Sequence, residues 1–525
     1  MELNKKYNSV DEEVSAEIVR DLCLWLRDFF TRRVNSRWID ERRCIPPYIV
    51  NEFAKKGIFG FHSSPEDGGL GLTTVDWIKL IGQLGGLDAT ISQLVAINGL
   101  GTRPYIAYGS KVQKENILHG LAKGHTLSCF AQTEDSAGTN FMAMESVAIK
   151  SSDNSSWTIN GSKVWIGNAG WSNIITLVSQ TKSEDGDDLG LTAFVVPTDT
   201  VGVIIGEELN TMGLRGVVQN RIDFKDVTIP VDAILGDVGD GLSVAVDAMS
   251  FTRLMISAQQ IGLMKKAVQV MWKFANARTI STGLLADNAI GVNFVSECIG
   301  RIDTIEILLN TCAKHMDSGK SISPELSSIC KVLSTEFAGY VTDTALQLLG
   351  GRGYEENNVI PQLVRDTRVT RIFEGPTEAL CSFIGSRASN DSLIVNFSFL
   401  SDDKAYSQQL IDEIDDKVAD YKADSFELPI TDEQKIQWIN YKKGLLVSWG
   451  ALCSAYCTVD EPNEDIESWL ESGGDRAPLF VNSPCFLSRE YINSAIERYK
   501  SDIGDVIQIS PALNSSLDEM LNTTI

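Results

Sequence analysis

Apolar residues recur at three- and four-residue spacing over most of residues 10–124, and this period predicts amphipathic helices. The clearest helical segments are Val14–Arg32, Asp76–Leu84 and Lys111–Leu121. Pro and Gly cluster at residues 44–47 and 64–72, where loops are expected. The pattern predicts an N-terminal helical domain over residues 1–127.

The period changes at Ser128, where short runs of β-branched and aromatic residues alternate with turn residues. The predicted strands are Met144–Lys150, Trp157–Asn160, Ser162–Ile166, Ile174–Gln180, Leu191–Pro197 and Arg221–Val227. The pair Asn160-Gly161 predicts a hairpin, and the acidic run 184–188 predicts a solvated turn. Together these features predict a small central β-barrel or sandwich domain over residues 128–238.

Helical periodicity returns after Asp240. A C-terminal four-helix bundle over residues 239–390 is predicted from the segments Leu242–Arg278, Val292–Ser318, Pro324–Leu349 and Thr377–Arg387. An extra helical region over residues 391–525 contains Gln408–Tyr421, Asp432–Tyr456 and Ser488–Tyr499, with an irregular stretch at Glu461–Pro484. The expected fold class is α+β, mainly α.

The formal net charge of -24 makes a nucleic acid or an anionic membrane an unfavourable partner, because both would be repelled over most of the surface. Residues 401–525 contain 24 acidic and 10 basic side chains, so -14 of the total charge lies there. We therefore expect a strongly acidic face on the extra helical region.

The ten cysteines include no Cys-x-x-Cys pair and the four histidines have no metal-binding spacing, so we expect a reducing compartment and no metal site. Cys453 and Cys457, at helical spacing, are interpreted as packing residues. The N-terminus lacks the apolar core of a signal peptide, and no apolar window approaches membrane-spanning length. A soluble, cytoplasmic protein without a membrane span is expected.

Residues 371–378, Arg-Ile-Phe-Glu-Gly-Pro-Thr-Glu, place the carboxylate of Glu374 just ahead of a predicted helix. Gly375 suits a helix cap and Pro376 a first helical position. Burial raises the proton affinity of such a carboxylate, whereas the positive end of a helix lowers it, and this balance can tune a base toward neutral pH. The octapeptide alone favours a simpler alternative, in which Glu374 only caps the helix.

Other segments carry more specific patterns. Residues 130–140 are Phe-Ala-Gln-Thr-Glu-Asp-Ser-Ala-Gly-Thr-Asn, and residues 163–169 are Lys-Val-Trp-Ile-Gly-Asn-Ala. Residues 347–354 are Gln-Leu-Leu-Gly-Gly-Arg-Gly-Tyr, followed by Arg-Asp-Thr-Arg at 365–368. In order and type, these segments and residues 371–378 resemble the acyl-CoA dehydrogenase family of flavoproteins, over about residues 51–388.

The resemblance implies a role for each matching position. Glu374 is the catalytic base, because Thr252 stands where some relatives place theirs, just before Arg253. The residues implied for FAD binding are Phe130, Gln132, Thr133, Gly138, Thr139, Trp165, Gly167, Arg278, Gln347, Gly350, Gly351, Thr377 and Glu378. The residues implied for substrate binding are Thr139, Ser250, Arg253 and Gly375. From the residues alone, Trp165 is equally consistent with a core aromatic of a β-strand.

Several positions depart from the family pattern. Gly167 and Pro376 each stand where the family has Thr. Arg278 is kept, but the Phe-Gly that follows it in the family becomes Thr282-Gly283 with one extra residue, and the expected Gln falls on Ala289 or Ile290. These departures predict weaker contacts to FAD across a dimer.

The implied reaction is a dehydrogenation in fatty acid metabolism. Glu374 removes the α-proton of an acyl-CoA or acyl-carrier-protein thioester while the β-hydrogen leaves as hydride to FAD, which gives the trans-2-enoyl thioester. An electron-transfer flavoprotein or another acceptor reoxidises the flavin, and a homodimer is implied because the Gly350-Gly351 loop reaches FAD held by the neighbouring subunit. The alternatives are a non-catalytic scaffold or assembly protein of this fold and a flavin-dependent oxidase or monooxygenase. The extra region resembles, in position and helical character only, the additional domain of very-long-chain members.

Overall fold

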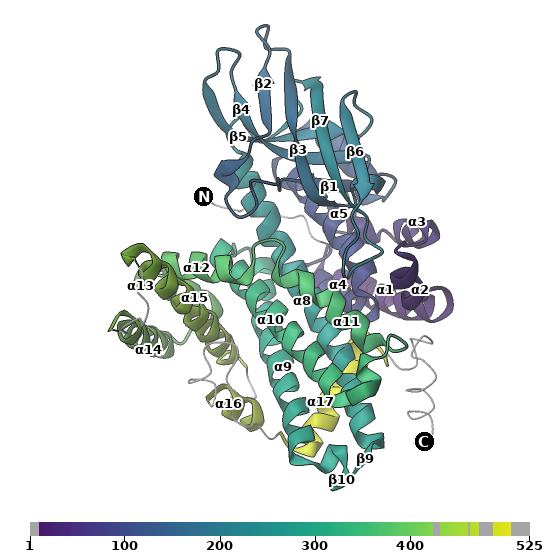
Figure 1. Cartoon of the computed structure of the whole chain (residues 1–525), viewed down its shortest axis with the longest axis vertical. Helices are drawn as coiled ribbons and strands as arrows, with labels where there is room; N and C mark the ends of the chain where they lie inside the picture. The colour runs from purple at the N-terminus through teal and green to yellow at the C-terminus, as the bar shows by residue number, and fades with distance from the viewer. Residues whose placement is uncertain (1–9, 424–430, 460–461, 472–486, 506–525) are drawn as a thin grey trace. The chain divides into compact units, whose positions relative to one another are not determined.

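The computed structural model describes residues 10–423, 431–459, 462–471 and 487–505 (Figure 1). The chain divides into two compact units. Unit 1 comprises residues 1–24, 36–77 and 90–252, and unit 2 comprises residues 25–35, 78–89 and 253–525. Mainly helical structure with one β region confirms the predicted fold class.

Unit 1 begins with helices. Those wholly within it are α2 (Ser36–Arg42), α3 (Pro47–Lys55), α6 (Lys111–Gln113), the π-turn η2 (Lys114–Leu118) and α7 (His119–Ala122). The predicted helices at 14–32 and 76–84 are confirmed as parts of α1 (Glu12–Arg33) and α4 (Thr74–Leu87), which both units share. The periodicity missed α5 (Ala89–Tyr108), because this helix is buried on nearly every face and has no polar side to mark its period.

The β region of unit 1 is one hydrogen-bonded set of eight strands. They are β1 (Ser128–Ala131), β2 (Val147–Lys150), β3 (Ser156–Gly167), β4 (Ile174–Lys182), β5 (Asp188–Pro197), β6 (Val203–Glu208), β7 (Gln219–Pro230) and β8 (Ile234–Leu235). The order is β6-β7-β3-β2-β4-β5-β8, and β1 pairs in parallel with β4. Trp157 and Phe194 lie edge to face in its core, with ring centroids 5.6 Å apart.

The predicted hairpin at Asn160-Gly161 is wrong, because β3 runs through both residues. The pairing of β3 with β7 shifts register between Ile159 and Gly161, and Gly161 has φ +140°. The Asn160 amide donates to Asp226 Oδ1 at 3.0 Å and accepts from the Asp226 N–H at 2.9 Å, so this side chain bonds the neighbouring strand. The Asn-Gly pair therefore forms a β-bulge rather than a turn.

Unit 2 contains the predicted bundle. Its elements are the second part of α8 (Gly241–Ala277), α9 (Ala289–Asp317), α10 (Pro324–Leu349), η6 (Gly350–Tyr354), α11 (Val359–Arg368), η7 (Val369–Arg371) and α12 (Thr377–Arg387). Helix α10 begins at its predicted residue because the Ser323 hydroxyl accepts from the Leu326 N–H and Pro324 takes the first position. The sequence pattern missed α11 as a separate helix.

The extra region is helical and packs on the bundle within unit 2. Its helices are α13 (Asn390–Leu400), α14 (Lys404–Ala423), α15 (Asp432–Tyr456), α16 (Glu464–Glu471) and α17 (Arg489–Ile503). Helices α12 and α15 lie side by side (Figure 1), and a Cβ on Gly444 would come within 1.9 Å of the Cys381 carbonyl oxygen. The prediction of an irregular stretch at 461–484 is wrong for residues 464–471, which form α16. Residues 461 and 472–484 of that stretch lie outside the described part of the chain.

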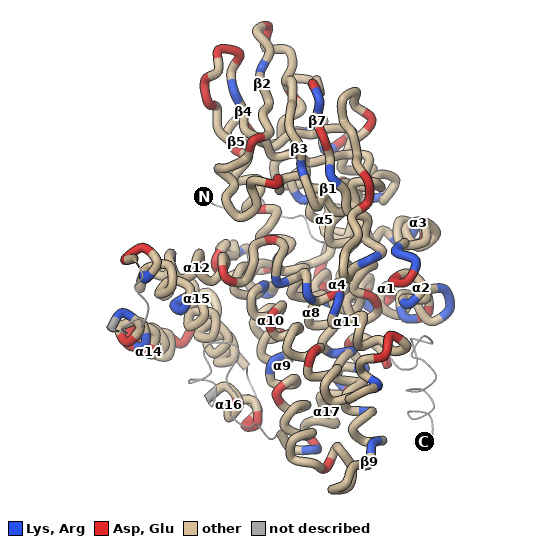
Figure 2. The backbone as a smooth tube through the Cα atoms, viewed as in Figure 1, with Lys and Arg blue, Asp and Glu red and all other residues tan. Residues whose placement is uncertain are grey.

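Helix α14 carries the acidic side chains expected of the extra region. Asp412, Glu413, Asp416 and Asp420 are exposed there, and basic residues lie along the same helix in Figure 2. Cys453 is buried as expected, whereas Cys457 is exposed. None of the described helices combines the length and the hydropathy that a membrane crossing needs.

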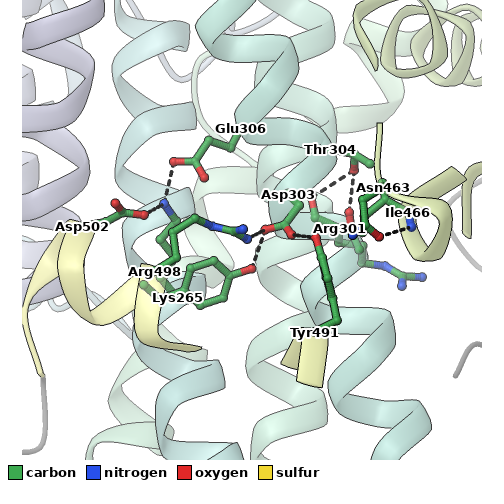
Figure 3. A network of polar contacts seen from close by, with 12 residues as sticks. Lys265, Arg301, Asp303, Thr304, Glu306, Asn463, Ile466, Tyr491, Arg498 and Asp502 are labelled. Atoms are coloured by element: carbon green, nitrogen blue, oxygen red, sulfur yellow. Dashed lines mark hydrogen bonds and ion pairs between the residues drawn. The ribbon is translucent and has the colours of Figure 1, made fainter. Parts of the chain in front are cut away.

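A ring contact and a polar network are prominent among the contacts that hold α16 and α17 against α9. Gly300 lets the ring of Trp469 lie directly on the α9 backbone, because a Cβ there would come within 2.7 Å of the indole. Asp303 is buried and accepts hydrogen bonds from Tyr491 at 2.6 Å, Tyr499 at 2.7 Å and Arg498 at 2.7 Å, all from α17 (Figure 3).

A second ion cluster extends this contact. Lys265 of α8, 3% exposed, donates to Glu306 at 2.5 Å and to Asp502 at 2.7 Å (Figure 3). The buried Lys265 ammonium is shielded from water and is compensated by both carboxylates. Loss of either carboxylate would leave this buried charge less well compensated. The extra region is therefore joined to the bundle by buried polar groups as well as by apolar side chains.

We expect Asp303→Ala to lower the free energy of unfolding by about 3 kcal/mol, because three donors of α17 lose their shared acceptor. Urea unfolding measures the loss, and limited proteolysis reports whether α17 detaches. The control is Glu497→Ala, which removes an exposed carboxylate that pairs with Lys500 of the same helix and should change stability by less than about 0.5 kcal/mol. A loss below about 1 kcal/mol for Asp303→Ala would contradict the role given to this network.

Candidate functional site

The turn that carries Glu374 lies in unit 2 between η7 and α12. Glu374 has φ +53° and Gly375 has φ +95°, so two consecutive residues adopt the left-handed backbone conformation. Such a conformation costs about 1–2 kcal/mol for a residue with a side chain, and it persists only where surrounding contacts impose it. A Cβ on Gly375 would come within 2.7 Å of Leu380 Cδ2, so glycine is required there for space as well as for conformation.

Two buried cations bind the carbonyl groups of this turn. Arg253 Nε and Nη2 each donate to the Glu374 carbonyl at 3.3 Å, and Nη1 donates to the Ser328 hydroxyl at 3.1 Å. Lys331 Nζ donates to the Gly375 carbonyl at 2.7 Å. Burial lowers the pKa of Arg253, against an opposing effect of Glu374, and burial lowers the pKa of Lys331 to about 8.

Glu336 of α10 connects the residues on either side of the turn. It accepts a hydrogen bond from the Thr377 hydroxyl at 2.6 Å and lies 3.4 Å from Arg371 Nη1. The expected capping is one residue in error: Pro376 is the N-cap of α12, and Thr377 is its first helical residue. Pro376 lacks a side-chain acceptor for the helix N–H groups, so the Glu336–Thr377 hydrogen bond is what fixes the start of α12.

In unit 1, the first group of residues predicted to bind a flavin lies at the end of β1 and in the segment that follows it. Phe130 is buried in the core, Gln132 is buried, and Thr139 is exposed. The side-chain oxygen of Gln132 has no hydrogen-bond partner in the described part of the chain. Beyond Gly138 lies open space, because a Cβ there would meet no atom within 4 Å. Thr133 is joined to β3, since its carbonyl accepts from the Val164 N–H at 2.9 Å.

A buried ion pair holds this segment against β3. Lys163 is fully buried, and its ammonium donates to Glu134 Oε1 at 2.6 Å and to the Gln132 carbonyl at 3.0 Å. The Glu134 carboxylate also accepts from the Glu145 N–H at 2.6 Å. Burial lowers the pKa of Lys163 to about 8; for Glu134, burial acts to raise the pKa, but the hydrogen bonds from Lys163 and Ser146 outweigh it and lower the pKa.

Trp165 is not a core aromatic, although it lies within a strand. Its backbone has φ +56°, and the pairing of β3 with β7 shifts register between Lys163 and Ile166. This second bulge turns the indole outward, so the side chain is 61% exposed. The alternative that makes Trp165 a core residue is therefore wrong.

The space at Gly167 explains why this position has no side chain. A Cβ there would come within 2.5 Å of Ile97 Cδ1, so the buried end of Ile97 in α5 occupies the place of any larger residue. A residue with a side chain at position 167 would therefore have to displace the end of Ile97.

The remaining predicted residues lie in two further groups. Gln347, Gly350 and Gly351 are exposed at the end of α10, and a Cβ on either glycine would meet no atom within 4 Å. Arg278 is exposed after α8, beside the short hairpin of β9 (Thr279–Ile280) and β10 (Gly283–Leu284), which accommodates the extra residue before Gly283. Within unit 2 this hairpin lies at the end of the bundle away from α12 (Figure 1).

The structure brings some predicted residues together and not others. Arg253 and Glu374 meet in unit 2 beside Gly375, and Thr377, two residues further along, donates a hydrogen bond to Glu336. Glu378 is exposed on α12 and Ser250 is buried in unit 1, where its hydroxyl has no partner among the described residues. Lys331 was not predicted. The signal for it was a single lysine inside the apolar run Ile329-Cys330-Lys331-Val332-Leu333.

Comparisons with known proteins identify the family. Sequence models of the acyl-CoA dehydrogenase N-terminal, middle and C-terminal domains match residues 19–125, 129–227 and 239–389. The very long-chain specific acyl-CoA dehydrogenase of Rattus norvegicus is 29% identical over 394 residues, which cover 73% of this chain and 60% of that protein. The chain thus spans about 60% of the length of such curated relatives.

Solved structures agree with this assignment. Butyryl-CoA dehydrogenase from Megasphaera elsdenii superposes with a TM-score of 0.67 at 25% identity, over 73% of this chain and 99% of that chain. An acyl-CoA dehydrogenase from Bacillus anthracis, 18% identical, has a TM-score of 0.71 and covers 98% of this chain and 94% of its own, so its fold includes the extra helical region. The chain belongs to the acyl-CoA dehydrogenase family.

We expect Gly167→Thr to lower the free energy of unfolding by about 1 kcal/mol, because the new side chain must displace Ile97 Cδ1. Ile97→Val removes only that methyl group and should cost about 1 kcal/mol by itself. In the double variant the two losses should not add, and the coupling should be about 0.5 kcal/mol or more in favour of the pair. Thermal or urea unfolding of the four proteins measures this cycle, and strict additivity would show that Ile97 does not exclude a larger residue.

Proposed function

We propose that this protein is an oxidoreductase that dehydrogenates an acyl thioester between its α and β carbons, with Glu374 as the base that takes the α-proton. The observation that carries the proposal is the left-handed turn at Glu374, held by Arg253, at the position where the family's base is found. A strained backbone at a half-buried carboxylate is typical of a group held ready for reaction.

In the proposed reaction, the Glu374 carboxylate accepts the α-proton and the product is the trans-2-enoyl thioester. An α-proton of a thioester is too weakly acidic for a carboxylate in water, so the site must polarise the thioester carbonyl. The family resemblance assigns this to a backbone N–H at Glu374, which acts as an oxyanion donor. The acyl chain excludes water from the carboxylate and thereby raises its basicity when substrate is bound.

The resident cofactor in this proposal is FAD, which supplies the acceptor for the β-hydrogen as hydride. The described residues fit such a group. The unpartnered side-chain oxygen of Gln132, the open space at Gly138 and the outward indole of Trp165 suit a flat, polar-edged ring. Phe130, Thr133, Thr139 and Gly167 complete this set by the family pattern.

We further propose a homodimer that shares its cofactors. Gln347, Gly350 and Gly351 would hold the adenine half of the FAD of the neighbouring subunit, and Arg278 would contact FAD across the dimer. Thr377 and Glu378, at the start of α12, are proposed for FAD binding by the family pattern. The exposed end of α10 supports this arrangement: the side chain of Tyr354 is 81% exposed there, and that of Ile290 is 66% exposed at the start of α9.

The substrate carrier and the electron acceptor follow from the family pattern and from charge. We propose acyl-CoA as the first candidate substrate and an acyl-carrier-protein thioester as the second, because a net charge of -24 disfavours an acidic carrier. An electron-transfer flavoprotein is the proposed acceptor. A cytoplasmic location is proposed on the nine free cysteines of the described residues, which suit a reducing compartment.

One experiment separates this function from the alternatives. The purified protein is examined for a bound flavin spectrum, and then titrated without oxygen with acyl-CoA and acyl-carrier thioesters of several chain lengths. Bleaching of the flavin by a thioester supports the dehydrogenase. A protein without flavin would favour a scaffold, and rapid reoxidation by air after reduction would favour an oxidase.

We expect Glu374→Gln to keep its bound flavin and to lose turnover by about four orders of magnitude, because an amide cannot accept the α-proton. Stopped-flow bleaching of the flavin by the best thioester of the panel measures the chemical step directly. The matched control is Glu497→Gln, which makes the same change at an exposed carboxylate of α17 that has no role in the proposed site and should keep the rate of proton abstraction. Near-normal bleaching by the Glu374 variant would overturn the assignment of the base.

A further inference from the structure

Lys331 is a fully buried ammonium in the middle of α10. Its neighbours in sequence are apolar, and Val332, Leu380, Cys381 and Leu445 form a buried cluster beside it. Burying a charge is costly unless a partner compensates for it. Lys331 makes no ion pair with the described residues, and its one hydrogen bond within that part of the chain goes to the Gly375 carbonyl at 2.7 Å. The nearby carboxylates of Glu374 and Glu336 favour the charge without forming an ion pair with it, so the position of this ammonium requires an explanation.

The position of the hydrogen bond between Lys331 and Gly375 explains why the ammonium is buried there. The Gly375 carbonyl follows directly on the Glu374 carbonyl, which Arg253 binds, so two consecutive peptide groups of the left-handed turn are each held by a cation from a different helix. Hydrogen bonds from charged donors are shorter and stronger than neutral ones. Removing either cation would release a backbone conformation that is itself unfavourable for Glu374.

We propose that Lys331 is a positioning residue for proton abstraction: by binding the Gly375 carbonyl it fixes the turn that aims the Glu374 carboxylate at the α-carbon of the thioester. This inference rests on the proposed function of Glu374. Lys331 touches neither substrate nor cofactor in this assignment and transfers no proton. It acts through the backbone of the next residue along the turn.

A role in stability alone does not account for this lysine. Burial lowers its pKa from 10.5 to about 8. Between these two values the unfolded chain holds the proton and the folded chain does not, so the group makes the folded state more stable as the pH rises. Below pH 8 the buried charge therefore costs stability. This cost is that of the protonated form relative to the neutral amine, so stability does not explain why the charged donor lies at this turn.

The surroundings of Lys331 define its pH dependence. The titratable and charged groups that face Lys331 or the Glu374 turn come from several elements. They are Glu374 itself, Arg253 of α8, Glu336 of α10, Arg371 of η7 and Cys381 of α12, with Tyr441 of α15 further out. Burial raises the pKa of Cys381 to about 12 and also raises that of Tyr441, so neither loses its proton near pH 8. Lys331 is charged below pH 8 and loses its proton above it, so proton abstraction should decline as the pH rises through 8.

The test measures proton abstraction without turnover. In deuterated buffer, the holoenzyme is incubated with 3-thia-acyl-CoA thioesters of short, medium and long chain, whose β position is sulfur and carries no hydrogen. Exchange of the α-hydrogen for deuterium, followed by mass spectrometry, reports removal of the α-proton alone. The variants are Lys331→Met, Lys331→Arg and Glu374→Gln, each with its melting temperature and flavin content.

We expect Lys331→Met to lower the exchange rate about 100-fold, with thioester affinity within about twofold of the parent and a melting temperature that is not lowered. Lys331→Arg retains a cationic donor, so it should recover at least about a tenth of the parent rate, and the decline near pH 8 should move to higher pH because arginine does not lose its proton there. Parent protein should show the decline at pH 8.

The matched control is Lys266→Met. Lys266 is also buried, has a pKa lowered by burial, and donates to a backbone carbonyl, that of Leu87, at 3.0 Å. This variant should exchange at the parent rate. An equal loss in the Lys266 variant, or a Lys331→Met protein that exchanges within about threefold of the parent, would overturn the proposal. A loss that appears only with a lowered melting temperature would also overturn it, in favour of a structural role. If Glu374→Gln still exchanges normally, the proposed function itself fails.

Discussion

The chain's candidate chemistry depends on one constraint, the left-handed backbone at Glu374 and Gly375. A non-glycine residue does not adopt this conformation without compensation, and here the compensation comes from cations on two long helices, Arg253 in α8 and Lys331 in α10. The lengths, register and burial of those helices therefore matter to the turn directly. Helices that pack elsewhere in the bundle act on Glu374 by keeping these two side chains in place.

Much of the fold could be predicted from local sequence. Helix α10, with a serine cap and a first-position proline, begins and ends at the predicted residues, whereas α5 has no polar face and so gave no helical period. The Asn160-Gly161 pair is ambiguous by itself. Whether it makes a hairpin or a bulge depends on Asp226 on a strand more than sixty residues away, which local reasoning does not include.

The candidate site could also be predicted only where local sequence carries a recognisable motif. The family resemblance pointed to Glu374 and Arg253, since both lie in recognisable segments, and the structure brings these two residues together. Lys331 has no motif, and its partner is a backbone carbonyl 44 positions along the chain, so only the packed structure connects them. Gly167 could be recognised in the sequence as a departure from the family pattern. The side chain that leaves no room at this position, Ile97, lies in α5, the helix that the hydrophobic period did not predict. A steric contact between a helix and a strand cannot be seen in the sequence of the strand alone.

The network around Asp303 makes the last part of the chain inseparable from the bundle. In α9, the Asp303 carboxylate has its hydrogen-bond donors on α17, and Gly300 packs against the ring of Trp469 on α16. A chain ending before α16 would expose the Asp303 carboxylate and the Lys265 ammonium on a face shaped for close packing. The extra region is therefore not a removable module, and unit 2 should melt as one cooperative body rather than in two successive steps.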